Sequence, residues 1–273
     1  TIDGKAYPND RYNAACSYSL IGKIDTSFYH LFRLANDANY KNYKHITSDS
    51  DLTALHNDER WKELILLVKE NKEEAEKNFD KPLVELLEGI RIEDQKYRNQ
   101  IDEIEAKYGF DSEEVTAHWK LIIKKDSINL IEVKKILDER GWLGADVIGS
   151  NGNSTLFLVI QHADIKTQLK YLPMMRDAVK KGNASGSSLA LLEDRVALRE
   201  GGKQIYGSQI GRDEETGEHY VLSLKDPENV DKRRAEVGLS PMAKYVGYWN
   251  MTWDVEKHKQ RMLQLELEKK TKK

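Results

Sequence analysis

The chain has 273 residues and a mass of 31.5 kDa, a size that fits one large domain or two modest ones. Its 43 basic and 46 acidic side chains nearly cancel, whereas a protein that binds nucleic acid through phosphates carries a strong basic excess. The single cysteine, Cys16, excludes an internal disulfide and a multi-cysteine zinc or iron–sulfur site. The longest apolar runs are far shorter than the roughly 18 residues of a membrane span. We therefore expect a helix-rich globular protein with no nucleic-acid partner and no membrane span.

Residues 1–70 predict paired helices. Ala15, Tyr18 and Gly22 suit two short helices that pack closely across a tight turn, with Gly22 as the left-handed residue that ends the first helix. Asp25 is placed to cap the second helix. The pattern resembles about one tetratricopeptide hairpin, and residues 49–61 resemble the helical cap of such arrays. One repeat cannot bury its own face, so we expect a further repeat upstream or docking onto the rest of the chain. These helices are also the predicted binding surface for a protein or peptide partner.

Residues 71–81 are predicted to connect this region to the rest, as part of a long, solvated connector helix, with a domain boundary between Asn71 and Pro82. Pro82 is typical of the first turn of a helix. Apolar residues then recur at spacings of three and four and predict one continuous helical seam, formed by Leu83, Leu87, Ile90, Tyr97, Ile101, Ile104 and Tyr108. The seam position between Ile90 and Tyr97 is held by Asp94.

A C-terminal helical domain with one small β-hairpin is predicted for residues 82–250, followed by a charged, frayed tail at 251–273. Gly141 is expected to stop a helix, and three glycines (Gly144, Gly149, Gly152) are expected to form a loop. The predicted helices cover about 111–124, 127–140, 154–163, 165–181, 187–200 and 227–237, and the strands 203–210 and 219–224, with a turn at 213–217. The helix over 154–163 is apolar all round, which predicts burial on every side. The fold class is therefore mainly α.

Standard phosphate-loop, nucleophile-elbow and zinc-protease motifs are missing from the sequence. Instead, Asp94 and Asn129 stand where the helical pattern requires apolar residues, and Gln161 and His162 end the all-apolar helix. Burying such groups without partners costs several kcal/mol, so they should meet one another or a ligand. Simpler explanations stay open: Asp94 could pair with Arg98, and His162 could bond a backbone carbonyl.

Seven short motifs occur in an order similar to that of an uncharacterised bacterial family, the domain of unknown function 6624 family, over about residues 82–250. They are Asp94–Gln95–x–x–Arg98, Asp126–x–x–Asn129, Gly141–Trp142, Gln161–His162–Ala163–Asp164, Asp194–Arg195–Val196, Tyr206–Gly207–Ser208–Gln209 and the run from Asp226 to Arg234. Ser208 and Leu143 depart slightly from the residues commoner in the family. Helices like those of residues 1–70 precede the domain in members from Bacteroidetes-type bacteria. The resemblance implies a shared polar site but no particular activity.

Two interpretations follow. In the first, the domain has a site for a polar small molecule or peptide and could be hydrolytic; His162, Asp94 and Asp194 are the candidate acid–base groups or metal ligands, although no metal set is assigned. The candidate ligand-binding residues are Gln95, Arg98, Asp126, Asn129, Gln161, Asp164, Arg195, Tyr206, Gln209, Arg233 and Arg234. Asp164 could merely cap a helix, and Asp194 could merely pair with an arginine. In the second interpretation, the protein is a non-enzymatic interaction module that uses its tetratricopeptide-like helices.

The first interpretation predicts that Asp94, Asn129, His162, Asp194 and Gln209 converge, with His162 largely buried beside an acidic or amide group of another helix. The sequence identifies no cofactor. A chain that begins at Thr1 is expected to be processed or trimmed, and we expect a soluble bacterial protein, cytoplasmic or exported after removal of a signal peptide.

Overall fold

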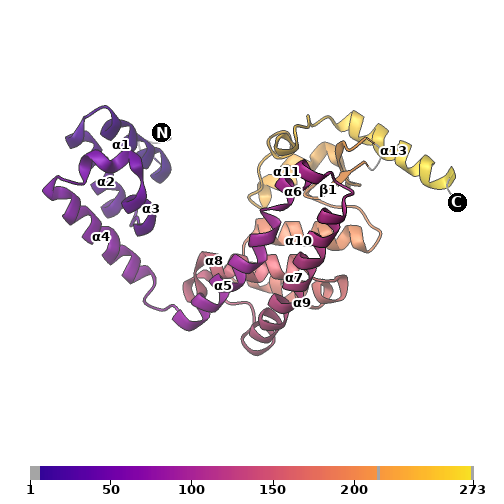
Figure 1. Cartoon of the computed structure of the whole chain (residues 1–273), viewed down its shortest axis with the longest axis horizontal. Helices are drawn as coiled ribbons and strands as arrows, with labels where there is room; N and C mark the ends of the chain where they lie inside the picture. Colours follow the sequence, from indigo (N-terminus) through magenta and orange to yellow (C-terminus); the bar gives the residue numbers. More distant parts are fainter. Residues whose placement is uncertain (1–6, 214–215, 272–273) are drawn as a thin grey trace. The chain divides into compact units, whose positions relative to one another are not determined.

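The computed structural model describes residues 7–213 and 216–271, and the chain divides into two compact units, Thr1–Phe79 and Asp80–Lys273. Helices make up most of both units (Figure 1), as the sequence predicts. None of the described helices combines the length and the hydropathy that a membrane crossing requires. The division between Phe79 and Asp80 lies within the predicted window of 71–82, and independent folding of the two units stays a prediction.

The first unit is a set of helices around one apolar core: α1 (Pro8–Leu20), α2 (Ile24–Asp37), α3 (Tyr43–Ser48), the 3-10 helix η1 (Ser50–Leu55) and α4 (Glu59–Ala75). Gly22 has the expected positive φ of 73° in the turn between α1 and α2. Asp25 does not cap α2, because the N-cap position falls on Lys23; its carboxylate pairs with Arg60 at 2.8 Å instead. The connector helix predicted to run through residue 81 is also shorter than expected, since α4 ends at Ala75.

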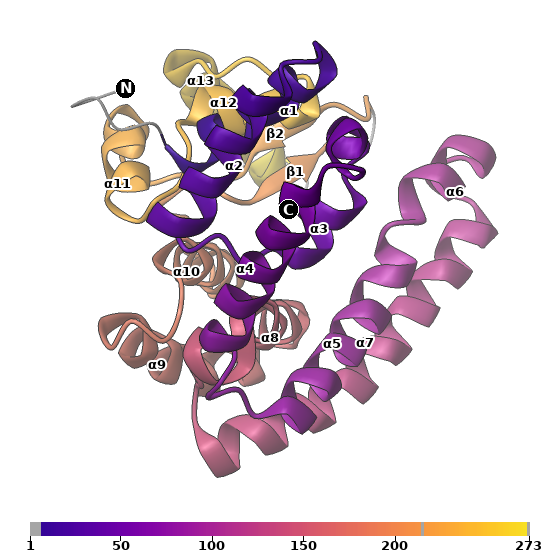
Figure 2. The same ribbon diagram turned by 90° about the vertical axis from the view of Figure 1, so that its left-hand side faces the viewer.

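The second unit contains the longer helices: α5 (Lys81–Arg98), α6 (Ile101–Tyr108), α7 (Glu113–Arg140), α8 (Ala145–His162), α9 (Ile165–Lys180) and α10 (Gly186–Arg199). Side chains of α5 and α7–α10 form its main core, and Figure 2 shows α5 lying along α7. The chain continues through β1 (Ile210–Arg212), β2 (His219–Val221), η2 (Pro227–Asn229), α11 (Val230–Glu236), α12 (Met242–Val246), η3 (Gly247–Trp249) and α13 (Val255–Thr271).

Two helix boundaries differ from the prediction. The apolar seam is not continuous, because α5 ends at Arg98 and α6 begins at Ile101. Conversely, the two helices expected over 111–124 and 127–140 are the single helix α7, which Ser112 caps by accepting a hydrogen bond from the Val115 backbone. No glycine or proline interrupts residues 113–140, so the helix has no reason to stop near 125. Asp126 and Asn129 are thereby placed on one helix, less than one turn apart.

The predicted glycine loop is part of α8. Gly149 has φ 68° and ψ 166° and kinks the helix, a conformation open only to glycine. Gly152 lies against Leu87, where a Cβ would come within 3.1 Å of the Leu87 Cδ1 atom. The rest of α8 is the buried helix that the sequence predicts, and it carries Gln161 and His162 at its C-terminal end.

The hairpin is antiparallel, with Ile210 opposite Val221, and its strands are shorter than predicted. Residues 203–209 and 222–224 lie outside the two strands; an isolated bridge between Gln204 and Leu224 and several hydrogen bonds of Gln204 connect them. Of the predicted turn, Glu214 and Glu215 lie outside the described residues. The tail expected to be frayed forms α13, so its charged residues are helical over Val255–Thr271.

Candidate functional site

Three helices bring four charged or titratable side chains together at one end of the main core. Asp94 and Arg98 come from α5, Asp126 from α7 and His162 from α8. The Asp94 Oδ1 atom lies 3.0 Å from His162 Nδ1, and Arg98 Nη2 donates to both carboxylate oxygens of Asp126, at 2.6 and 2.7 Å. Gln95 donates to the other oxygen of Asp94 at 2.6 Å. We call Asp94, Arg98, Asp126 and His162 the charged cluster.

The His162 ring has a defined orientation. Its Nδ1 atom faces Asp94 at 3.0 Å and Arg98 Nε at 3.3 Å, and it cannot donate to the first while accepting from the second. The 3% exposed carboxylate of Asp94 favours a proton on Nδ1. The Nε2 atom then carries the free lone pair, and it has no hydrogen-bond partner within residues 7–213 and 216–271. The side chain keeps 18% of its surface exposed, so it is largely buried beside a carboxylate of another helix, as predicted.

Burial and neighbouring charges shift the pKa values of Asp94 and Asp126 in opposite directions. Burial raises the pKa of Asp94, but the hydrogen bond and charge of His162, with Arg98 and Gln95, outweigh it and lower the pKa below its usual value. For Asp126, burial together with the negative charge of Asp94 outweighs Arg98 and His162, and the pKa is raised. Asp94 is therefore the permanent anion that orients His162.

A cavity of about 460 Å³ lies beside the cluster, within the size range of small-molecule sites. It is lined by Phe157, Leu158, Gln161, His162, Leu191, Arg195, Ser208, Gln209, Ile210, Gly211, Arg212, His219, Tyr245 and Trp249. Helices α8 and α10, the segment before β1 and the region of α12 all contribute. We call it the His162 cavity.

Arg195 is the most informative residue of the His162 cavity. Its guanidinium donates to the Gln161 backbone carbonyl at 2.9 Å and to Gln209 Oε1 at 3.0 Å, and no carboxylate among the described residues pairs with it. Burial, and then the charges of Arg199 and Arg98, lower its pKa, so the protonated form is held at a cost. Nearby, the buried Gln161 Oε1 atom has no hydrogen-bond partner in the described part of the chain. An anionic ligand would compensate the charge of Arg195.

Asp194, predicted as a catalytic candidate, binds the backbone of a neighbouring segment instead. It is fully buried and accepts hydrogen bonds from the backbone nitrogens of Ile205, Tyr206 and Ser208, at 2.6, 2.9 and 2.9 Å. It does not line the His162 cavity, and among the described residues it pairs with no arginine. Its carboxylate fixes the chain segment that carries Gln209.

Other predicted site residues also form hydrogen bonds with backbone groups. Arg233 donates to the carbonyls of Ile205, Lys225 and Asp226, and the buried Arg234 donates to those of Tyr206 and Ser240. Asp164 caps α9 through the Thr167 nitrogen at 2.7 Å, the simpler of its two explanations.

Asn129 is buried on α7, three residues after Asp126, with its Nδ2 atom unpartnered among the described residues, but it does not line the His162 cavity. Neither does Tyr206, whose backbone is the part that Asp194 and Arg234 bind. The predicted convergence of five residues is thus partly wrong. Asp94 meets His162 directly and Gln209 faces the same cavity, whereas Asp194 and Asn129 lie apart from its lining.

The sequence interpretation missed the aromatic wall of the His162 cavity. Tyr245 donates its hydroxyl proton to the Ser208 carbonyl at 2.6 Å, and its ring meets Trp249 edge-on at 5.0 Å. The Arg234 guanidinium lies 4.7 Å from the Tyr245 ring centroid. The run Tyr245–Val246–Gly247–Tyr248–Trp249 could have signalled this wall, because aromatic side chains commonly line small-molecule sites.

Within the described part of the chain, two groups of side chains have ligand atoms close enough for a metal, within 4.8 Å of one another. In the charged cluster, Arg98 already binds both oxygens of Asp126, so a cation would have to displace it. In the first unit, the group is Cys16, Asp49 and Asp51, but burial raises the pKa of the Cys16 thiol to about 12, which keeps it protonated. We assign no metal to either group.

The second unit is a mainly helical domain with a charged cluster beside a cavity, and a family match covers this whole arrangement. The chain belongs to the family of unknown function DUF6624, whose model matches residues 75–257. The resemblance found in the sequence motifs is thereby confirmed. No curated protein and no solved structure matches the chain.

Proposed function

We propose that the His162 cavity binds a small anionic molecule and that His162, oriented by Asp94, transfers protons during its hydrolysis. The proposal rests on Arg195, a half-buried cation whose protein partners within the described residues are neutral oxygens. Burying an unpaired charge is costly, and an anion in the cavity would remove most of that cost. A ligand hydroxyl or amide could in turn donate to the open Gln161 Oε1 atom.

The proposed proton transfer depends on which ring nitrogen of His162 carries the proton. With its Nδ1 proton directed at Asp94, His162 can take a proton from a water molecule at Nε2. The resulting hydroxide attacks the carbonyl or phosphoryl centre of the bound anion, and His162 returns the proton to the leaving group. Asp94 stabilises the imidazolium formed in between, and Arg195 stabilises the negative charge on the substrate.

Calorimetric titration with inorganic phosphate tests the binding half of the proposal. We expect saturable binding to the wild type and at least about tenfold weaker binding to Arg195→Gln, because the loss of one charge-assisted contact costs about 1.5–3 kcal/mol. Arg176→Gln is the matched control, since Arg176 is half exposed and pairs with Glu193 outside the cavity. Equal affinity in both variants, or no binding by the wild type, would overturn the assignment.

Chromogenic phosphate and carboxylate esters test the chemical half. His162→Gln should abolish turnover and leave phosphate affinity within a few-fold of the wild type, because the binding charge of Arg195 is intact. Retention of the wild-type rate in His162→Gln would remove His162 from the mechanism.

A second proposal concerns the first unit, which we infer to bind a protein or peptide partner at the turn after α1. Leu20 and Ile21 there are 66% and 65% exposed, and contiguous exposed apolar surface commonly marks an interaction site. A photoreactive residue in place of Ile21 should cross-link to a discrete partner, and Leu20→Ser should reduce the yield without changing the melting temperature. Unchanged yield would contradict the proposal.

A further inference from the structure

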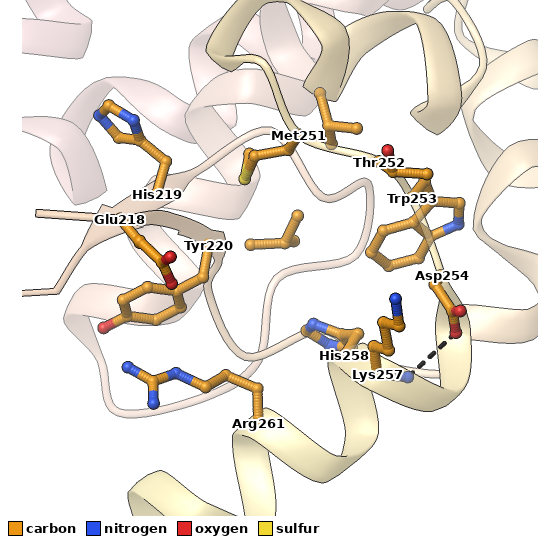
Figure 3. Close-up of a pocket in the computed structure, with 12 residues that line it drawn as sticks. Glu218, His219, Tyr220, Met251, Thr252, Trp253, Asp254, Lys257, His258 and Arg261 are labelled. Carbon is orange, nitrogen blue, oxygen red and sulfur yellow. Dashed lines mark hydrogen bonds between the residues drawn. The ribbon is translucent and has the colours of Figure 1, made fainter. Parts of the chain in front are cut away.

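A second cavity, of about 510 Å³, lies between β2, the segment after η3 and the start of α13 (Figure 3). Its walls include Tyr220, Met251, Trp253, Lys257 and His258, and it shares only His219 with the lining of the His162 cavity. We call it the His258 cavity. Nothing in the proposed hydrolytic mechanism uses these residues.

His258 is the polar group that points to a ligand. Its side chain is buried, with 8% exposure, yet its ring makes no hydrogen bond to any residue in the described ranges. The Trp253 ring lies 5.4 Å away, tilted by 44°. Burial, and then the positive charge of Lys203, lower the pKa of His258, so the ring is neutral at pH 7 and can donate from one nitrogen. The ring nitrogens are not closed off from solvent, and a ligand acceptor in the cavity could take the hydrogen bond that the ring can donate.

The charged side chains around the cavity differ in whether they already have a protein partner. Arg261 forms an ion pair with Asp213, and its guanidinium carbon lies 5.3 Å from the Tyr220 ring centroid. Its charge is therefore already compensated. The Asp254 carboxylate accepts from the Lys257 backbone nitrogen at 3.0 Å and caps α13. The exposed Lys257 side chain has no ion pair among the described residues, and Figure 3 shows it rising beside His258 toward Trp253.

The remaining wall is apolar and aromatic. Met251 and Trp253 point into the cavity in Figure 3, and Val221 and Val246 complete the lining. Glu218 lies across the cavity, beside Tyr220, away from Lys257 and His258. Positive charge and a hydrogen-bond donor thus occupy one end, next to an apolar body.

We propose that the His258 cavity binds an amphipathic anion, a carboxylate attached to an apolar chain or ring. The carboxylate lies against the Lys257 ammonium and the His258 ring, and the apolar part packs on Trp253 and Met251. The two donors orient the charged head of the ligand, and burial of its apolar part adds to the affinity.

Calorimetric titration of the full chain with octanoate tests the proposal. We expect saturable binding, about tenfold weaker binding by Lys257→Met, and unchanged binding by Lys232→Met, in which an exposed lysine of α11 undergoes the same change. Octylamine, with the same chain and the opposite charge, should bind at least about tenfold more weakly than octanoate.

Arg195→Gln separates this proposal from the first one. Octanoate affinity should be unchanged in that variant, whereas loss of octanoate binding there would place the ligand in the His162 cavity. Absence of octanoate binding, equal affinities of Lys257→Met and Lys232→Met, or equal binding of octylamine would each overturn the proposal. All three variants change partly exposed or surface cations, and melting temperatures confirm that they are folded.

Discussion

Asp94 and Asp194 are two buried carboxylates of one domain, 3% and 0% exposed, and they use their oxygens in opposite ways. Asp194 accepts from three backbone nitrogens of a neighbouring segment. Asp94 accepts from side chains, Gln95 and His162, of which the second retains a free ring nitrogen beside a cavity. Burial alone therefore does not mark a functional carboxylate. The kind of partner does, because backbone donors only fix the chain, whereas a titratable partner can react.

The largest effect is expected from Asp194→Ala. The substitution leaves three buried backbone N–H groups without an acceptor, and we expect a loss of about 3–5 kcal/mol in the free energy of unfolding. Urea unfolding measures it. Glu193→Ala, which removes the neighbouring carboxylate from its ion pair with Arg176, should cost under about 1 kcal/mol. Similar costs for the two variants would show that Asp194 does not hold the 205–208 segment.

Asp94→Asn should have a smaller effect on stability and a larger one on chemistry. The amide oxygen can still accept from His162, so we expect a loss of about 1 kcal/mol in the free energy of unfolding. Ester hydrolysis should fall by at least about 100-fold, because the imidazolium loses its counter-charge.

Glu93→Gln, one residue earlier on the same helix and paired with Lys125 at the surface, is the control and should keep the wild-type rate. A large stability loss in Asp94→Asn with an unchanged rate would make Asp94 structural, like Asp194.

The pH dependence of stability should differ in sign between the two carboxylates of the charged cluster. Because the folded pKa of Asp94 is lowered, its ionised form stabilises the fold above about pH 4, and this contribution disappears as the pH falls through the folded pKa. The folded pKa of Asp126 is raised, so its ionised form costs stability, and the cost disappears as the pH falls toward about 4.

Urea unfolding across this range measures both effects. The wild-type advantage over Asp94→Asn should shrink below about pH 4, and the advantage over Asp126→Asn should grow as the pH falls to that value. Parallel curves for the two variants would contradict the assignment of charge.

Most of the fold could be predicted because its signals are local. The cap at Ser112, the stop at Gly141 and the all-apolar run of α8 each specify a helix from neighbouring residues alone. The wrong helix boundaries arose where an apolar pattern continues past the end of a helix, or where a helix continues past a predicted end. The heptad-like seam runs on past Arg98 although the helix ends there, and α7 continues past 125 because nothing in its sequence stops it.

The site was predicted only in part, for a physical reason. A polar residue at an apolar position shows that a partner exists, but not whether that partner is a backbone nitrogen or a side chain. Asp94 and Asp194 therefore look alike in the sequence, and only the fold distinguishes them. Tyr245 and Trp249 were missed because aromatic residues are as common in ordinary cores as in cavities.

The most direct test of the central claim is the ¹⁵N spectrum of the His162 ring, assigned among the 7 histidines by its loss in His162→Gln. The account predicts a proton on Nδ1 and an unprotonated Nε2 near pH 8, with an Nε2 signal that shifts on addition of phosphate in the wild type but not in Arg195→Gln. A proton on Nε2, with Nδ1 accepting from Arg98 instead, would contradict it.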